Sequence, residues 1–421
     1  MPDCSHETHY LIAGASHAAL AALHAIRLVD GDRPLTVIAK DDSLPYSPTV
    51  LPYVVSGRSD PDTVLLRDDK YFADHNVCYL RGRHVTSLST AEHAATLSDG
   101  IRVRFEKLLL ATGARPAVPP IPGLAESTYH ALRTLEDARR LRERLPTTRH
   151  AVVIGGGLIG MHAAENLRKG GAQVTVIEMQ PHVLPAYFDA DAAARIERAF
   201  ATAGVEIRTG ARVERIIPGA PDSILELIDG TRVTADLLLV GTGVIPVTDY
   251  LDGSGIATDH GILVDDVMRT NDPSVWAAGD VARARDFFGS APVLNGILPD
   301  AVEQGRIAGM AMAGDPAVRP YRGAVPLNTF GFFGNHAIAV GSNLAPPGAD
   351  VMLRADPAGN CYLKIVLNQG RLHGIFGINV SFDAGVMWEL IARRVELGPL
   401  RTRFLEQPQE TARTLMSRLW R

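Results

Sequence analysis

The hexapeptide GGGLIG, residues 155–160, carries three glycines at the spacing of a phosphate-binding turn. It directly follows the apolar run AVVI and precedes a helix-forming segment, which is the context that this motif requires. In such a turn Gly155 permits the sharp reversal, Gly157 lets the backbone approach a pyrophosphate, and Gly160 lets the helix pack on the strand. The start of the helix adds unpaired N–H groups and a partial positive charge. The pattern therefore predicts a dinucleotide site.

Glu178 ends the next predicted strand, 23 residues after Gly155, where a carboxylate can accept both ribose hydroxyls. A 2′-phosphate beside this carboxylate would be repelled by up to ~4 kcal/mol at ~4 Å and an effective dielectric constant of about 20. The following residues, MQPHVLP, contain no arginine to bind such a phosphate. We therefore expect NADH to be preferred over NADPH.

A second, degenerate version of the motif occurs earlier, in GASHAA at residues 14–19. Gly14 is retained, while Ser16 and Ala19 stand at the second and third glycine positions. Ser16 is small enough for close approach of a phosphate, and alanine is tolerated at the third position. Asp41 follows the next apolar strand and is a suitable ribose partner. The segment predicts a second dinucleotide site.

The elements that must position these residues are two βαβ units, residues 9–42 and 150–180. Their strands are continuous apolar runs, which is typical of parallel strands buried on both faces of a doubly wound sheet. Beyond residue 321 the pattern changes to alternating strands, with a hairpin around residues 368–370 and an apolar helix from 383 towards 395.

Length and composition set further limits. A chain of 421 residues suggests roughly three domains. The net charge of −5 without a basic stripe argues against nucleic acid as a partner. The polar N-terminus lacks the features of a signal peptide, and no apolar run reaches the ~18 residues of a membrane span. Three scattered cysteines suit a reducing compartment, so we expect a cytoplasmic protein with no metal site.

The ordered segments LIAGASHAA, ATGARP, VVIGGGLIG, GTGVIP and AAGDVA, with the two ribose acids, resemble the FAD-containing pyridine-nucleotide-disulfide oxidoreductase superfamily. The resemblance implies an α/β fold with two Rossmann-like doubly wound dinucleotide-binding domains and a C-terminal α+β interface domain. The FAD domain would be split, comprising residues 1–118 and 246–322. The NAD domain would comprise residues 119–245, and the interface domain residues 323–421.

The resemblance also assigns site residues. Asp280 matches an aspartate that binds the flavin ribityl chain, Val85 matches a backbone contact to adenine, and the helix near Asp300 matches one that faces the flavin pyrimidine ring. The residues expected to bind FAD are Gly14, Ser16, Ala19, Asp41, Val85, Thr112, Gly113, Arg115, Asp280, Asp300 and Ala301. The residues expected to bind NAD are Gly155, Gly157, Leu158, Ile159, Gly160, Glu178, Gly241 and Gly243.

One branch of the superfamily uses a single redox cysteine before a GLPYY-like stretch, which VLPYV (50–54) resembles. The matching residue here is Thr49, which cannot form a sulfenate, a thiolate or a mixed disulfide. Ferredoxin and rubredoxin reductases also lack this cysteine, and they often have a lysine where this chain has Tyr53. His162 replaces the usual glutamate in the NAD helix. We treat both residues as catalytic candidates, although packing of His162 as a polar core residue is the alternative.

Without a thiol relay, the resemblance implies that a hydride is exchanged with NAD(H) and that single electrons pass to or from an iron–sulfur protein or partner subunit. Within the superfamily, the chain resembles the flavoprotein portion of nitrite reductases and the flavoprotein subunits of NADH-linked 2-oxoacid dehydrogenase complexes. The alternatives are an NADH oxidase, a stand-alone NADH:ferredoxin or nitrite-reductase-type reductase, and a nucleotide-binding protein without redox activity. The C-terminal domain suggests a homo-oligomer interface.

Overall fold

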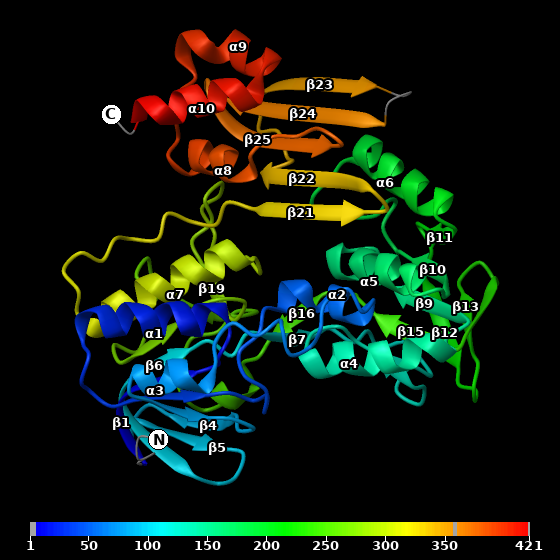
Figure 1. The fold of residues 1–421 in the computed structure, drawn as a ribbon. Coiled ribbons are helices and arrows are strands. Elements are labelled where there is room, and N and C mark those ends of the chain that lie inside the picture. Colours follow the sequence, from blue (N-terminus) through cyan, green and yellow to red (C-terminus); the bar gives the residue numbers. More distant parts are fainter. Residues whose placement is uncertain (1–5, 357–359, 420–421) are drawn as a thin grey trace. The chain divides into compact units, whose positions relative to one another are not determined.

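The computed structural model describes residues 6–356 and 360–419, which divide into two compact units (Figure 1). Unit 1 contains residues up to 48 together with 61–115 and 244–324. Unit 2 contains residues 49–60, 116–243 and those from 325 onward. Residues 49–60, assigned above to the FAD domain, thus group with the segment that is predicted to bind NAD, and the predicted NAD and C-terminal domains fall in one unit.

Unit 1 is built on a sheet with the strand order β3-β2-β1-β6-β5-β4. Strand β18 also pairs with the carboxyl-terminal half of β6, on the edge that does not face β1. Strands β1, β2, β3, β6 and β18 are parallel, whereas β5 runs antiparallel to β4 and β6. The chain continues from β1 to β2 on one side and returns to β6 on the other. The switch of direction between β1 and β6 is where a doubly wound sheet binds its ligand. The strands are β1 (Glu7–Ala13), β2 (Leu35–Ile38), β3 (Val77–Leu80), β4 (Val85–Ser89), β5 (Ala94–Leu97), β6 (Arg102–Leu110) and β18 (Val275–Ala277).

The register follows from the burial of both faces. Ile12 of β1 lies between Val37 of β2 and Leu109 of β6. All four residues of β2 are buried, which explains its unbroken apolar sequence LTVI. The remaining elements of unit 1 are short, apart from α1 (His17–Val29) and α7 (Leu298–Ala313). They are α3 (Asp69–Asp74), η3 (Asp249–Leu251), β17 (Ile262–Leu263), β19 (Ala282–Ala284) and β20 (Val293–Leu294).

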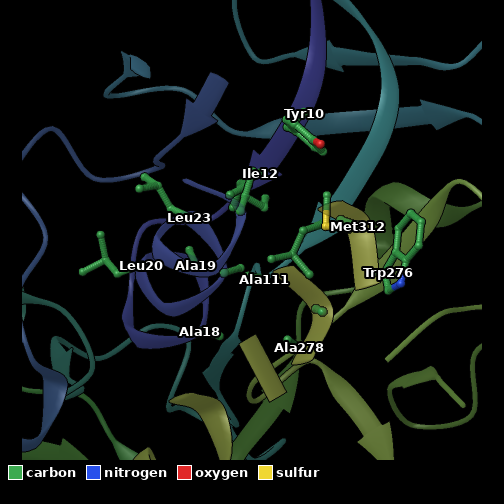
Figure 2. Packing of buried hydrophobic residues seen from close by; sticks show 14 of the residues in the cluster. Tyr10, Ile12, Ala18, Ala19, Leu20, Leu23, Ala111, Trp276, Ala278 and Met312 are labelled. Carbon is green, nitrogen blue, oxygen red and sulfur yellow. The ribbon is translucent and has the colours of Figure 1, made fainter. Parts of the chain in front are cut away.

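Helices α1 and α7 pack side by side over one face of this sheet (Figures 1 and 2). Figure 2 shows Ile12 of β1 and Leu23 of α1 in the same core as Met312 of α7. The helices approach closely because glycines of α7 face alanines of α1. A Cβ on Gly305 would lie 2.1 Å from the carbonyl oxygen of Ala18, and one on Gly309 would lie 2.4 Å from that of Ala22.

Unit 2 begins with a fully parallel sheet of order β11-β10-β9-β15-β8. Its direction switches between β9 and β15, beside the glycine turn of residues 155–160. An antiparallel sheet, β12-β13-β14, is inserted between β11 and β15 in the sequence. The strands are β8 (Tyr129–His130), β9 (His150–Ile154), β10 (Gln173–Ile177), β11 (Val205–Arg208), β12 (Val213–Ile217), β13 (Ser223–Leu227), β14 (Arg232–Ala235) and β15 (Leu237–Val240).

The helices of this part begin at recognisable caps. Thr134 and Asp137 form a capping box at the start of α4, and Asp189 caps α6 by accepting from the Ala192 N–H. Helix α5 instead has Gly157 at its N-cap position, and glycine has no side chain that could cap the helix. The helices are α2 (Leu51–Val55), α4 (Leu135–Arg144), α5 (Leu158–Lys169) and α6 (Ala190–Thr202), and the short 3₁₀ turns are η1 (Pro48–Val50) and η2 (Leu145–Thr147).

The rest of unit 2 is an antiparallel sheet of order β21-β22-β25-β24-β23, against which α8 packs at β22 and β25. The predicted hairpin is confirmed, since Asn368 pairs with Arg371 across the turn. The strands are β21 (Leu327–Phe332), β22 (Asn335–Gly341), β23 (Asp350–Asp356), β24 (Cys361–Asn368) and β25 (Arg371–Ile378). The helices are α8 (Ala384–Ala392), η4 (Gly398–Leu400), α9 (Arg401–Glu406) and α10 (Pro408–Leu419).

A two-stranded pairing of β7 (Ala114–Pro116) with β16 (Val244–Pro246) joins the segments on either side of the inserted part of the chain. Two sheets built around parallel strands and flanked by helices, followed by an α+β region, confirm the predicted fold class. In the described part of the chain, no helix is both long and apolar enough to cross a membrane.

The contact between α1 and α7 makes a prediction about stability. Gly305→Ala should lower the free energy of unfolding by about 1–3 kcal/mol, because the added methyl group meets a backbone carbonyl that cannot move aside. Gly385→Ala, at an exposed helical position in α8, is the matched control and should be neutral or stabilising by up to ~1 kcal/mol. Chemical denaturation of both variants measures the difference, and equal effects would contradict the close-packing account.

Candidate functional site

Two nucleotide turns, one in each unit, carry the site residues. In unit 1 the turn follows β1, where Gly14 has φ +123° and its N–H donates to the Ile38 carbonyl at 2.8 Å. A Cβ at Gly14 would lie 2.1 Å from the Ala111 carbonyl oxygen, so only glycine fits. Ser16 is the N-cap of α1, yet its side chain forms no capping hydrogen bond. The first-turn N–H groups of α1 therefore have no side-chain cap and can bind an anion.

The other expected FAD residues of unit 1 follow the carboxyl ends of neighbouring parallel strands. Asp41 lies three residues after β2, and its Oδ2 accepts from the Tyr46 hydroxyl at 2.5 Å. This hydrogen bond holds the carboxylate in place, while its second oxygen can accept from a ribose hydroxyl. Val85 is buried at the first position of β4, and Ala19 is buried in the first turn of α1.

The ATGARP segment fastens the turn after β6 to the returning chain. The Thr112 hydroxyl hydrogen-bonds to the Val247 carbonyl and to the Tyr250 hydroxyl, both at 3.1 Å. Gly113 has φ +67°, and its carbonyl accepts from the Val247 N–H at 3.0 Å. Arg115 pairs with Asp249 at 3.3 Å. These contacts show that Thr112 and Arg115 hold the turn after β6 against residues 247–250, in addition to any contact with FAD.

Asp280 follows the AAG turn after β18, close to the start of α1. Burial lowers the pKa of the His17 imidazole, and the negative charge of Asp280 opposes this shift only in part. His17 Nε2 in turn lies 3.0 Å from the Ser47 hydroxyl. The Gly279 N–H donates to Gln304 Oε1 of α7 at 2.9 Å, which ties the turn to that helix. Sequence reasoning missed His17 and Gln304, since neither stands in the glycine pattern.

Asp300 lies in the first turn of α7 and is 2% exposed. Asn295 Nδ2 donates to its Oδ2. Burial raises the pKa of Asp300 to about 7, so the carboxyl group carries its proton for much of the time at neutral pH. Ala301 is next in the helix, and its N–H donates to the Ile297 carbonyl at 3.1 Å. The Asp300 side chain thus points into the protein and is not available to a cofactor. The backbone at the start of α7 is the part of this helix that is suited to bind one.

The turn of unit 2 is closer to an ideal glycine motif. Gly155 has φ +110°, and a Cβ there would lie 2.5 Å from the Gly241 carbonyl oxygen. A Cβ at Gly160 would lie 2.0 Å from the Gly155 carbonyl oxygen. By contrast, a Cβ at Gly157 would meet no atom within 4 Å. The first and third glycines are needed for backbone packing, whereas the space in front of the second is open to a phosphate.

Four further residues expected to bind NAD lie at or beside this turn. Leu158 and Ile159 form the first two positions of α5, and the Ile159 side chain is 37% exposed. The Gly241 N–H donates to the Ile154 carbonyl at 2.8 Å, which places the GTG turn beside the end of β9. Gly243 has φ +112° and open space at its Cβ position. The two turns together form a cradle of backbone with few side chains.

Glu178 is buried directly after β10, with an exposed fraction of 8%. Its Oε2 accepts from the Gly156 N–H at 2.5 Å, and its Oε1 accepts from the Gln180 N–H at 2.7 Å. Each oxygen retains a second lone pair that can accept from a ribose hydroxyl. The turn and its acidic partner therefore fit the pyrophosphate and ribose of a dinucleotide, as the corresponding residues of unit 1 do.

The structure brings the two catalytic candidates, His162 and Tyr53, together in unit 2. Helix α2 packs against α5, and the Tyr53 and His162 rings meet edge to face, with centroids 6.4 Å apart. The other side of the imidazole meets Phe330 of β21 at 4.6 Å, again edge to face. Sequence reasoning missed Phe330, because nothing in a strand 168 residues farther along the chain connects that strand with helix α5.

The environment of His162 is apolar. Burial lowers its pKa to about 4, so the imidazole is neutral at physiological pH. Its Nδ1 is buried and has no hydrogen-bond partner among the described residues. The guanidinium of Arg58 lies 4.9 Å from the centre of the Tyr53 ring. These contacts favour a packing role for His162 and do not equip it as a proton acceptor near pH 7.

Among residues 6–356 and 360–419, no group of three or more histidine, cysteine, aspartate or glutamate side chains could hold a metal ion. Cys361 lies in β24, where its Sγ is 3.6 Å from the Asn379 carbonyl oxygen. Thr49 lies in η1, directly before α2. Its side chain provides a hydroxyl at the position that matches the redox cysteine of the single-cysteine branch described above.

Comparisons with known proteins agree with this geometry. The family model for pyridine nucleotide-disulphide oxidoreductases matches residues 8–308. The chain is 54% identical to the epsilon subunit of NADH-dependent phenylglyoxylate dehydrogenase from Aromatoleum evansii, over 98% of both chains. It is 30% identical to putidaredoxin reductase of Pseudomonas putida, over 70% of this chain and 72% of that one. The solved complex of putidaredoxin reductase with putidaredoxin matches with a TM-score of 0.86 and 26% identity, over 97% and 98% of the chains.

Glu178 should determine the choice of nicotinamide cofactor. The wild type should use NADH at least about tenfold more efficiently than NADPH, because the carboxylate repels a 2′-phosphate. Glu178→Gln should reduce this ratio of kcat/KM values by about tenfold, mainly by weakening the use of NADH. Glu214→Gln, at an exposed carboxylate in β12, serves as the control. Equal efficiency of the wild type with both cofactors would sink the assignment.

His162 should shape the acid stability of unit 2. Its folded pKa of about 4 lies below the ordinary value of 6.5, so its contribution to stability is complete above pH 6.5 and is lost as the pH falls towards 4. His162→Phe should keep the ring packing and remove this loss. Between pH 7 and pH 5 the wild type should lose on the order of 2 kcal/mol more stability than the variant.

Urea unfolding at the two pH values measures this difference. The same substitution at His24, exposed on α1, is the control and should leave the pH dependence close to that of the wild type. An equal loss of stability in His162→Phe and wild type would show that the imidazole does not titrate as its burial implies.

Proposed function

Because the chain belongs to the pyridine nucleotide-disulphide oxidoreductase family, we propose that it is the NAD-reducing flavoprotein subunit of a 2-oxoacid dehydrogenase complex, with phenylglyoxylate as the substrate of that complex. In this role it exchanges a hydride with NAD(H) and single electrons with an iron–sulfur protein or subunit. The observation that carries the proposal is the 54% identity with the Aromatoleum evansii epsilon subunit over nearly the whole of both chains.

The chain is an NAD(H)-dependent oxidoreductase, and its cofactors are FAD and NAD(H). When bound, the flavin accepts a hydride and can release electrons singly, which is a property of the cofactor. The protein's task is to hold FAD and NAD(H) and to orient them relative to each other. We assign the turn at Gly14 and Ser16, with Asp41, to FAD. We assign the turn at Gly157, with Glu178, to NAD.

The α2 segment supports electron transfer over thiol chemistry. In unit 2 this segment packs against α5, the helix of the NAD turn. Thr49 lies in η1, just before α2, and a threonine hydroxyl cannot form the sulfenate or disulfide through which an oxidised cysteine accepts an electron pair. Tyr53 and His162 present a tyrosine and a neutral imidazole there. The assignment of either residue to catalysis remains a proposal, and burial makes positioning the better reading for His162.

The partner is proposed from the relatives. Neither glycine turn offers a site for an aromatic 2-oxoacid, so that chemistry would belong to other subunits, and this chain would deliver the electrons to NAD. Putidaredoxin reductase, which is solved in complex with putidaredoxin, supports docking of a separate electron-transfer protein. A stand-alone ferredoxin reductase is therefore the second candidate. An NADH oxidase that reduces oxygen directly is the third, since a 29%-identical relative from Methanocaldococcus jannaschii carries that name.

We further propose the domain division inferred from the sequence, with FAD bound by residues 1–118 and 246–322, NAD by residues 119–245, and an interface domain from residue 323. A cytoplasmic location and a homo-oligomer formed through the interface domain are parts of the same proposal.

Isolation from the native cell tests the partner directly. Purification through an affinity tag at low salt should recover the chain with iron–sulfur subunits, because single electrons need such an acceptor. The recovered assembly should reduce NAD in the presence of phenylglyoxylate. Chain recovered alone that rapidly reduces added ferredoxin would favour the stand-alone reductase. Stoichiometric oxygen consumption with NADH would favour the oxidase.

A further inference from the structure

Helix α7 extends beyond the start of α1, the helix that follows the turn assigned to FAD. The two helices run in the same direction, since Gly305 of α7 contacts Ala18 of α1 and Gly309 contacts Ala22, one turn farther along both helices. With this pairing, α7 begins more than one turn before α1, which is roughly 9 Å at 1.5 Å per residue. Its first turn therefore projects past the carboxyl edge of the parallel sheet, where doubly wound sheets bind their ligand.

The turn after β18 lies against the starts of both helices. A Cβ at Gly279 would lie 3.2 Å from the Ala18 Cβ and 3.8 Å from the Ala301 Cβ. In the segment that leads into α7, a Cβ at Gly296 would lie 3.6 Å from Oδ1 of Asp280. The first turn of α7 thus lies among the elements that carry the residues assigned above to FAD.

Asp300 places a buried carboxyl group in this first turn. Its Oδ2 accepts from the Asn295 amide nitrogen, and no lysine, arginine or histidine of the described residues pairs with it. A carboxyl group in the first turn of a helix is normally ionised, because the helix start carries a partial positive charge. Here burial raises the pKa to about 7, while the Tyr321 hydroxyl opposes this shift and the charge of Glu303 adds to it. Both protonation states are therefore populated near neutral pH.

The other charged and titratable groups on these elements are placed differently. Glu303 forms an ion pair with Arg306 at 2.7 Å. Burial raises the pKa of the Tyr321 phenol well above its usual range, and it lowers the pKa of the His17 imidazole. Asp280 is the acid of the turn and is assigned above to the cofactor itself. The carboxyl group in the first turn of α7 combines deep burial, a pKa near neutral and the lack of a paired cation among the described residues.

We propose that Asp300 takes up one proton from solvent when a hydride is added to the flavin, and releases it when the electrons leave. A hydride carries two electrons and one proton, so it adds one negative charge to the flavin, and one proton on Asp300 cancels that charge. When the two electrons leave, this proton and the one delivered with the hydride return to solvent. The half-buried Asn295, which donates to the carboxyl group, places solvent close to it.

The coupling acts through the start of α7, without contact between the carboxyl group and the cofactor. An ionised Asp300 outweighs the roughly half positive charge of the helix start, whereas a protonated Asp300 leaves the helix start positive. A negative charge on the flavin therefore favours the protonated form, and the protonated form in turn stabilises the reduced flavin. The inference rests on the assignment of FAD to the turn at Gly14, which is proposed above.

Spectroelectrochemical titration of the FAD-loaded full-length protein at several pH values tests this coupling. The pH dependence of the flavin midpoint potential counts the protons taken up with the electrons. Just above pH 7 the wild type should take up about two protons per two electrons, and Asp300→Asn about one, because an amide does not bind the extra proton. Asp32→Asn, at an exposed carboxylate between α1 and β2, is the matched control and should behave as the wild type.

Infrared difference spectra identify the group that binds the proton. Reduction of the wild type at pH 8 should produce the C=O stretching band of a protonated carboxyl group, which shifts in D2O and is missing in Asp300→Asn. Uptake of one proton per two electrons by the wild type at every pH would overturn the inference. So would a second proton that persists in Asp300→Asn, since the flavin itself would then bind it.

Two further variants keep the test decisive. If Asp300→Asn fails to fold, Asn295→Ala removes the hydrogen bond donated to the ionised carboxyl group. The pH range of the second proton should then move upwards, and an unmoved range would contradict the coupling. Ser16→Glu should abolish FAD binding, because a carboxylate in the turn repels a pyrophosphate. A Ser16→Glu protein that keeps its FAD would count against the FAD assignment, whereas an unchanged proton count in Asp300→Asn would count against this inference alone.

Discussion

Close backbone contact at the carboxyl ends of parallel strands is the constraint on which both proposed nucleotide sites depend. At Gly14, Gly155 and Gly160 a Cβ would lie 2.0–2.5 Å from a carbonyl oxygen of the neighbouring turn or strand. Only glycine allows these contacts, and they bring the start of a helix directly to the strand end. The unpaired N–H groups of that helix then face the space in which a pyrophosphate can bind. The acids at Asp41 and Glu178 follow from the same geometry, because each comes shortly after the end of the next parallel strand.

The parts of this arrangement that depend on local pattern could be predicted from the sequence. Apolar runs bounded by glycine turns identified β1, β9 and β10, and the spacing to the next acid identified Glu178. Contacts between distant segments could not be predicted, because no periodicity encodes them. Phe330 contacts His162 from the C-terminal sheet, and residues 49–60 group with the segment proposed to bind NAD although they follow the first βαβ unit in the chain. Burial also changed the character of Asp300, whose carboxyl pKa the sequence alone does not disclose.

The most specific chemical feature of the chain is the set of side chains in the segment from Thr49 to Tyr53 and in helix α5, which this segment contacts. A hydroxyl takes the place of a thiol, and a tyrosine meets a buried imidazole. Because burial keeps that imidazole neutral at physiological pH, the pair contributes shape and packing without fixed charge. A protein of this kind can orient two cofactors and exclude water, while the redox capacity resides in the flavin.

That account is tested most directly by counting electrons. Anaerobic titration of the isolated FAD-loaded chain with dithionite, followed by the visible absorbance of the flavin, measures how many electrons the protein accepts. With no sulfur-based centre in the redox pathway, full reduction should require two electrons per FAD. A requirement for four electrons per FAD would reveal a second two-electron centre, such as a redox-active disulfide, and would contradict the proposed route of single electrons to an external acceptor.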